Sequence, residues 1–296
     1  MRITQTMVSR NLLDDLGDVT ERLSRTQERL SSGKQLTAPS DDPFGVSQAL
    51  MFRLDVSTQQ QYQRNVQEAS SWQDATDTAL SRVNDAVLRA RDLLIQGAND
   101  SSGASARQSI ATEIDQLIDE VKNEGNAKYA GRYVFSGSAT LTQPYTQGAS
   151  DAYAGNTEVM KREIGPGVQL DLNVTGQSVL GDGSGGILKV LRDISNDLKT
   201  NNSANLQNTD IAALDAAHDT LLTAQAIVGA RANRLETANS RLQQLEEAST
   251  KSLSNVEDAD MAKTLVDFST QQAVYQAALK SGANLIQPSL MDFLSN

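Results

Sequence analysis

The chain of 296 residues contains no cysteine, and aromatic residues make up only 4% of it. Without cysteine there is no disulfide framework, no thiolate nucleophile and no cysteine-bound metal. Few aromatic residues leave few large anchors for a compact core, and the apolar residues present are mostly Leu, Val, Ile and Ala. We therefore expect an elongated helical protein that is not an enzyme, with no catalytic, cofactor-binding or metal-binding residues and no cofactor.

Clustered positive charge and long apolar runs are also missing. The formal net charge is −11, and Lys and Arg form no block, so we expect neither nucleic acid nor a membrane as a partner. No run approaches the roughly 18 apolar residues of a membrane-spanning helix. Acidic residues interrupt the first 30 positions, so we expect no cleaved signal peptide, and a secreted chain would leave by another route.

A heptad pattern of apolar residues occupies each end of the chain. Apolar residues spaced alternately four and three positions apart form one narrow stripe along a helix. A narrow stripe packs better against another helix than against a globular core. The N-terminal stripe comprises Leu12, Leu16, Val19, Leu23, Thr26 and Leu30. The C-terminal stripe comprises Met261, Leu265, Phe268, Gln272, Tyr275, Leu279, Gly282 and Ile286.

The two stripes can pack on each other inside one molecule or against other molecules. Thr26, Gln272 and Gly282 weaken them, so an isolated pair would be poorly held. We therefore expect their apolar residues to form an assembly interface, with the terminal helices becoming ordered when subunits assemble.

The middle of the chain follows a different pattern. Between Gly131 and Gly186 lie 11 of the 19 glycines, and apolar residues alternate with polar ones. This predicts a strand starting at Tyr133 and a hairpin of residues 157–164 and 168–174. On either side the helical period returns, which predicts helices over 4–30, 44–97, 110–125, and 211–253.

These predictions combine into a nested layout. The expected fold is mainly α with a small β insert: a long-helix coiled-coil bundle with both termini at one pole and a β-rich domain inserted mid-chain. The expected domains are a terminal coiled-coil assembly domain (1–43 plus 254–296), a helical bundle (44–130 plus 187–253) and a surface insert (131–186).

Other conspicuous residues have structural interpretations. Asp42 is placed to cap the next helix with Pro43 at its first position, which is a better reading than a catalytic pair with Asp41. The Gly-rich segment 181–186 lacks the ligands of a calcium or phosphate loop and is interpreted as a flexible linker. His218 lies in a helical pattern without a catalytic constellation.

Five short motifs occur in order along the chain. They are Met-Arg-Ile-Thr at 1–4, Leu-Ser-Ser-Gly-Lys at 30–34, Pro-Ser-Asp-Asp-Pro at 39–43, Tyr-Val-Phe-Ser-Gly-Ser at 133–138 and Ser-Leu-Met-Asp-Phe-Leu at 289–294. As an ordered set they resemble the hook-filament junction proteins of the bacterial flagellum (hook-associated protein 3, FlgL), relatives of flagellin. The resemblance covers residues 1–140 and 187–296 and says little about the insert.

The resemblance implies a structural adaptor outside the cell, exported unfolded by the flagellar type III route. It implies four kinds of partner: a hook-associated protein 1 type junction protein on the hook side, flagellin on the filament side, sibling subunits in a ring, and a cytoplasmic export chaperone.

Two alternatives stay open. Flagellin itself shares the Leu-Ser-Ser-Gly phrase and the terminal heptads, although Pro43 and the Phe-Leu-Ser-Asn ending at 293–296 favour the junction protein. From another class, a monomeric binding or enzymatic module would carry its activity in residues 131–186.

Overall fold

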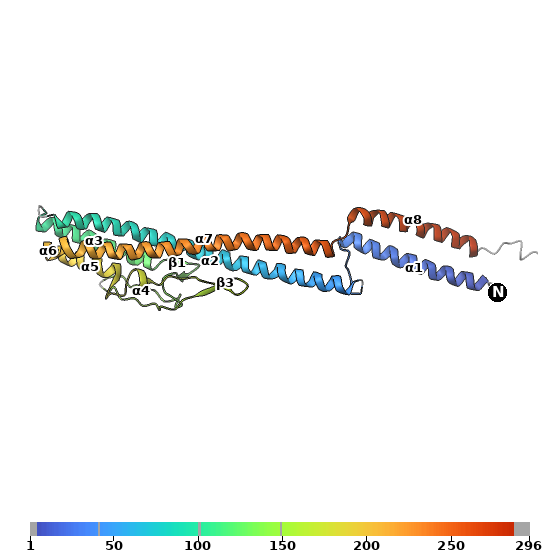
Figure 1. The fold of residues 1–296 in the computed structure, drawn as a ribbon, viewed down its shortest axis with the longest axis horizontal. Helices are drawn as coiled ribbons and strands as arrows, with labels where there is room; N and C mark the ends of the chain where they lie inside the picture. Colours follow the sequence, from blue (N-terminus) through green and yellow to red (C-terminus); the bar gives the residue numbers. More distant parts are fainter. Residues whose placement is uncertain (1–4, 41, 100–101, 149, 287–296) are drawn as a thin grey trace, which may run out of the picture. The chain divides into compact units, whose positions relative to one another are not determined.

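A computed structural model describes residues 5–40, 42–99, 102–148 and 150–286 (Figure 1). Long helices dominate it, as the heptads and helical spacing predict. The helical elements are α1 (Gln5–Ser32), α2 (Pro43–Ala98), α3 (Ala104–Gly125), α4 (Gly176–Val179), α5 (Gly186–Lys199), α6 (Ser203–Asn205), a π-helical turn η1 (Leu206–Asp210), α7 (Ile211–Glu257) and α8 (Met261–Ile286). None of the described helices is long and apolar enough to span a membrane.

The strands form two small antiparallel pairs. They are β1 (Lys128–Tyr129) with β2 (Arg132–Tyr133), and β3 (Lys161–Gly165) with β4 (Val168–Asp171). The expected hairpin is confirmed, but its strands are shorter than predicted. Beyond the strands, the Asn173 side chain joins the two segments in place of backbone pairing. Its Oδ1 accepts a hydrogen bond from Met160 N at 2.8 Å, and its Nδ2 donates one to Glu158 O at 2.9 Å.

The chain forms two compact units. Unit 1 comprises residues 1–58 and 245–296, and unit 2 comprises residues 59–244. The finer division into three domains stays a prediction.

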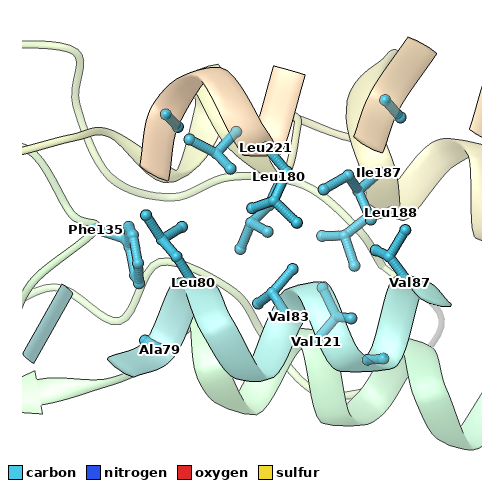
Figure 2. Close-up of a cluster of buried hydrophobic side chains, with 14 of the residues drawn as sticks. Ala79, Leu80, Val83, Val87, Val121, Phe135, Leu180, Ile187, Leu188 and Leu221 are labelled. Atoms are coloured by element: carbon cyan, nitrogen blue, oxygen red, sulfur yellow. The ribbon is translucent and has the colours of Figure 1, made fainter. Parts of the chain in front are cut away.

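Unit 2 contains nearly all of the core. Side chains from α2, α3, α5 and α7 meet there, and Leu80, Ile118 and Leu188 are fully buried. The insert contributes to the same cluster: Phe135 and Leu180 lie among the helical side chains (Figure 2). The helices and the insert of unit 2 therefore share one core.

The helix boundaries follow local chemistry. Phe44 N donates to Asp42 Oδ1 at 3.1 Å, and Pro43 is the first residue of α2, which confirms the predicted cap. Asp41 lies outside the described residues. After α1 the chain reverses at Gly33, whose φ of +69° is a left-handed conformation that glycine adopts without steric cost, and Gly33 N donates to Arg29 O at 2.9 Å.

Candidate assembly surface

Helices α1 and α8 pack as an antiparallel pair in unit 1. Thr26 Oγ1, near the end of α1, donates a hydrogen bond of 2.8 Å to Gln271 Oε1 of α8. Leu12 lies against Gly282, where an added Cβ would come within 3.0 Å of Leu12 Cδ2. The start of α1 and the end of α8 therefore lie at the same end of the pair. The N-terminal stripe thus faces α8 within one molecule.

The N-terminal stripe is the face of α1 that turns toward α8. Thr26 is buried at 8% exposure, and the five apolar members of the stripe, Leu12, Leu16, Val19, Leu23 and Leu30, are all partly buried. Residues between them are mostly exposed. The sequence pattern therefore found the packed face of α1.

The C-terminal stripe is divided between two faces of α8. Phe268 and Tyr275 are partly buried on the α1 side, which carries at steps of four and three Thr264, Phe268, Gln271, Tyr275, Ala278 and Gly282. Met261, Leu265 and Leu279 lie about 60–100° around the helix and are 47%, 57% and 45% exposed. Gln272 is exposed as well, and the side chain of Ile286 lies outside the described residues.

Apolar exposure is concentrated in unit 1. Of the 40 buried hydrophobic residues among those described, only Ala49 belongs to unit 1, whereas 12 of the 19 large exposed hydrophobic residues do. The described part of unit 1 therefore has almost no buried apolar core, and its exposed apolar residues make it the candidate assembly surface.

Helix α2 adds four of these exposed residues, which lie outside the two terminal stripes. Phe44, Leu50, Met51 and Leu54 are 57–72% exposed. Their positions fall on one side of the helix over three turns, which is the signal that could have identified them.

A buried carboxylate holds together the loops of unit 1. Glu257, at 3% exposure, accepts a hydrogen bond of 3.0 Å from Arg53 Nε, and Arg53 Nη2 and Lys34 Nζ pair with its other oxygen. The hydrogen bonds from Arg53 hold the pKa of the Glu257 carboxyl below its usual value. The backbone is joined at the same place, since Gln35 N donates to Glu257 O at 2.7 Å.

Helix α8 starts on a separate cap. Asp260 Oδ1 accepts from Ala262 N at 3.0 Å and from Lys263 N at 3.1 Å. These bonds satisfy two of the free N–H groups in the first turn of α8. The cap and the Glu257 contacts fix where α7 ends and α8 begins.

The remaining candidate residues have structural roles. His218 Nε2 lies 2.8 Å from Asn84 Oδ1 between α7 and α2. Segment 181–186 is a compact turn and not the flexible linker expected from its composition: a Cβ at Gly181 would come within 1.8 Å of Gly185 O, and Tyr145 Oη donates to Gly181 O at 2.7 Å. Within the described ranges, His, Asp and Glu form no group of three that could hold a metal.

Comparisons with known proteins agree with this architecture. The bacterial flagellin N-terminal helical region matches residues 3–140, and the bacterial flagellin C-terminal helical region matches residues 211–294. Flagellar hook-associated protein 3 of Escherichia coli is 27% identical over 277 residues, covering 86% of this chain and 87% of that protein.

A filament protein and a solved structure complete the comparison. The flagellar filament 30.7 kDa core protein of Treponema maltophilum is 30% identical over 287 residues, 95% of each chain. The crystal structure of Bacillus cereus FlgL is 22% identical and superposes with a TM-score of 0.61, covering 69% of this chain and 99% of that one, which shows a shared fold. The chain therefore belongs to the bacterial flagellin superfamily, has the FlgL-type fold and is a structural component of the bacterial flagellum, not an enzyme.

Proposed function

We propose that this chain is an adaptor that joins the hook-side junction zone of the flagellum to the flagellin filament, with unit 1 as the assembly part. The main support is the distribution of apolar side chains: the described residues of unit 1 include 12 large exposed hydrophobic ones, and Ala49 is their only buried hydrophobic residue. The name of the E. coli relative, flagellar hook-associated protein 3, agrees with a place beside the hook.

In this proposal the terminal pair provides cohesion between subunits. Fully burying an exposed Leu or Met stabilises by roughly 1.5–3 kcal/mol. Met261, Leu265 and Leu279 are 45–57% exposed, so about half of that stabilisation is still available from each on assembly. The α1–α8 contact keeps the other apolar residues in place. The proposed interface comprises Leu12, Leu16, Val19, Leu23, Leu30, Met261, Leu265, Phe268, Tyr275, Leu279 and Ile286.

The proposed neighbours are sibling subunits in a ring, a hook-associated protein 1 type junction protein and flagellin. Before assembly the exposed apolar face of α8 needs cover, so we propose a cytoplasmic export chaperone that binds it, and export without a cleaved signal peptide. Residues 44–130 and 187–253 would form an outer helical layer and residues 131–186 a surface insert.

A filament subunit is the second candidate function. The observation that favours it is the 30% identity to a flagellar filament core protein over 95% of both chains. An adaptor occupies one short zone, whereas a filament subunit occupies the whole filament, so position in the flagellum separates the two.

The test uses the absence of cysteine. Leu141 is 83% exposed, so Leu141→Cys gives a single thiol for a fluorescent maleimide in cells expressing the full chain. We expect one focus at the hook-filament boundary. Label along the filament would assign the chain to the filament, and label elsewhere on the cell would contradict both functions.

A further inference from the structure

Two carboxyl groups meet at the turn that joins α5 to α7 in unit 2. Asp210, the last residue of η1, is only 5% exposed, and its Oδ2 is buried without a hydrogen-bond partner among the described residues. Its carboxyl lies within hydrogen-bonding reach of Asp197 on α5. Two carboxylates cannot hydrogen-bond without a proton, because each offers only acceptors.

The turn itself organises Asp197. Asn202 Nδ2 donates to Asp197 Oδ1 at 3.1 Å, and Asn205 Nδ2 donates to Asp197 Oδ2 at 3.0 Å. Both oxygens of Asp197 therefore already accept hydrogen bonds. Asp210 Oδ2 has no donor among the described residues, so the proton belongs on Asp210.

Other charged groups near the turn are engaged elsewhere. Asp193, one turn before Asp197, binds Lys189 Nζ at 2.5 Å. The Arg107 guanidinium donates to Gly97 O at 2.8 Å and to Asn201 Oδ1. The charges that act on Asp210 are those of Asp197 and Asp193, and both are negative.

We propose that Asp197 and Asp210 share one proton and form a clamp that holds residues 200–210 on α5 more tightly as the medium becomes acidic. The π-helical turn makes this contact possible, since its wider winding sets Asp210 at the end of η1, next to α5. When the proton leaves, the buried charge of Asp210 faces the like charge of the partly buried Asp197, and the turn loosens.

Burial, reinforced by the charge of Asp197, raises the pKa of Asp210 to about 6. This value is above the 3.8 of an unperturbed Asp. The contribution of the clamp to stability is therefore complete below pH 3.8 and is lost as the pH rises through about 6. Between pH 8 and pH 5 it amounts to about tenfold in the folding equilibrium constant.

The test compares the full chain with Asp210→Asn, whose amide donates to Asp197 at every pH. Urea unfolding is followed at pH 5, 6, 7 and 8 by the fluorescence of Trp72, the only tryptophan, which is buried in unit 2. We expect the wild type to gain about tenfold in folding constant on acidification relative to the variant. Asp219→Asn, an exposed acid on α7, should keep the wild-type pH dependence.

Two further measurements keep the proposal falsifiable if Asp210→Asn folds poorly. In the wild type, the ¹³C resonance of the Asp210 carboxyl should titrate near pH 6, and amide exchange of residues 206–214 should slow as the pH falls, after correction for intrinsic rates. Titration near pH 4 would overturn the proposal. If 1 mM CaCl₂ stabilises the wild type at pH 7 but not the variant, the two carboxylates hold a cation and not a shared proton. That result would also overturn the proposal.

Discussion

The guanidinium of Arg53 and the carboxylate of Glu257 form a two-pronged contact across 204 residues of sequence, with Arg53 Nε 3.0 Å from Glu257 Oε2. Glu257 is buried, whereas Arg53 is about half exposed. The contact joins α2 to the end of α7, and Lys34 brings the loop after α1 to the same carboxylate. The side chain of Glu257 thus connects three segments of unit 1: the loop after α1, helix α2 and the end of α7.

Replacing Glu257 by Gln should destabilise unit 1 by about 1–3 kcal/mol, because the partners lose a buried acceptor but stay partly hydrated. Limited proteolysis within residues 33–42 and 258–260 should accelerate, while the fluorescence of Trp72 in unit 2 stays unchanged. Glu247→Gln, an exposed acid on the same helix, is the matched control. Equal protection of both variants would show that Glu257 does not hold the loops.

The same carboxyl predicts an acid sensitivity of unit 1. Its pKa in the folded state is below the unperturbed 4.5 because of the Arg53 hydrogen bonds. Its contribution is therefore present above pH 4.5 and is lost as the pH falls through the lower folded value. Protease resistance of the loops should decline in acid in the wild type, and Glu257→Gln should remove that part of the decline.

Changing Met261, Leu265 and Leu279 together to Ser should abolish assembly without unfolding the monomer, since exposed positions each change stability by about 0.5 kcal/mol or less apart from helix propensity. Circular dichroism should remain helical, while complementation of a strain lacking this protein should fail. Leu141→Ser, the same kind of change at a more exposed position in unit 2, should complement. Normal filaments with the triple variant would remove α8 from the interface.

The same triple variant tests the export proposal. Binding to the flagellar export chaperone should weaken, because the chaperone would cover the same apolar face of α8. Pull-down from cells before assembly measures this directly. Unchanged binding would separate the chaperone site from the assembly surface.

Two glycines in helices should respond in opposite directions. Gly282→Leu forces a side chain against Leu12, which is already 3.0 Å from a Cβ at this position, and should loosen the α1–α8 pair by about 1–3 kcal/mol. Leu12→Ala in the same chain should restore part of the lost stability.

At Gly229 an added Cβ meets nothing within 4 Å, so Gly229→Ala should stabilise α7 by about 1 kcal/mol. Thermal unfolding monitored by circular dichroism compares them, and a harmless Gly282→Leu would argue against the close approach.

Helical periodicity was a reliable guide where apolar residues lie inward. It identified α1, α2 and α7 to within a few residues, and the Asp42 cap and the 165–167 hairpin followed from local chemistry. In α8 it selected Leu265 and Leu279 for the packed side, but Thr264 and Gln271 occupy it. A count of apolar residues cannot detect a polar pair such as Thr26 and Gln271, because the pairing depends on the partner helix.

Long-range contacts were also beyond the sequence pattern. Composition suggested a separable insert, yet Phe135 and Leu180 lie in the core of unit 2 (Figure 2). Removing residues 131–186 would therefore expose helical side chains, so insert deletion is a poor test of function. The ionic contact of Glu257 likewise depends on residues more than 200 positions away.

The hydrogen bond between Thr26 and Gln271 gives one alignment of α1 and α8 a lower free energy than alternative alignments. Sliding the helices by seven residues would set these polar groups against side chains such as Val19 or Ala278, and the lost bond would favour the original match. A thin coil with few apolar contacts thereby keeps a defined stagger, so every copy presents Met261, Leu265 and Leu279 at the same height along the pair.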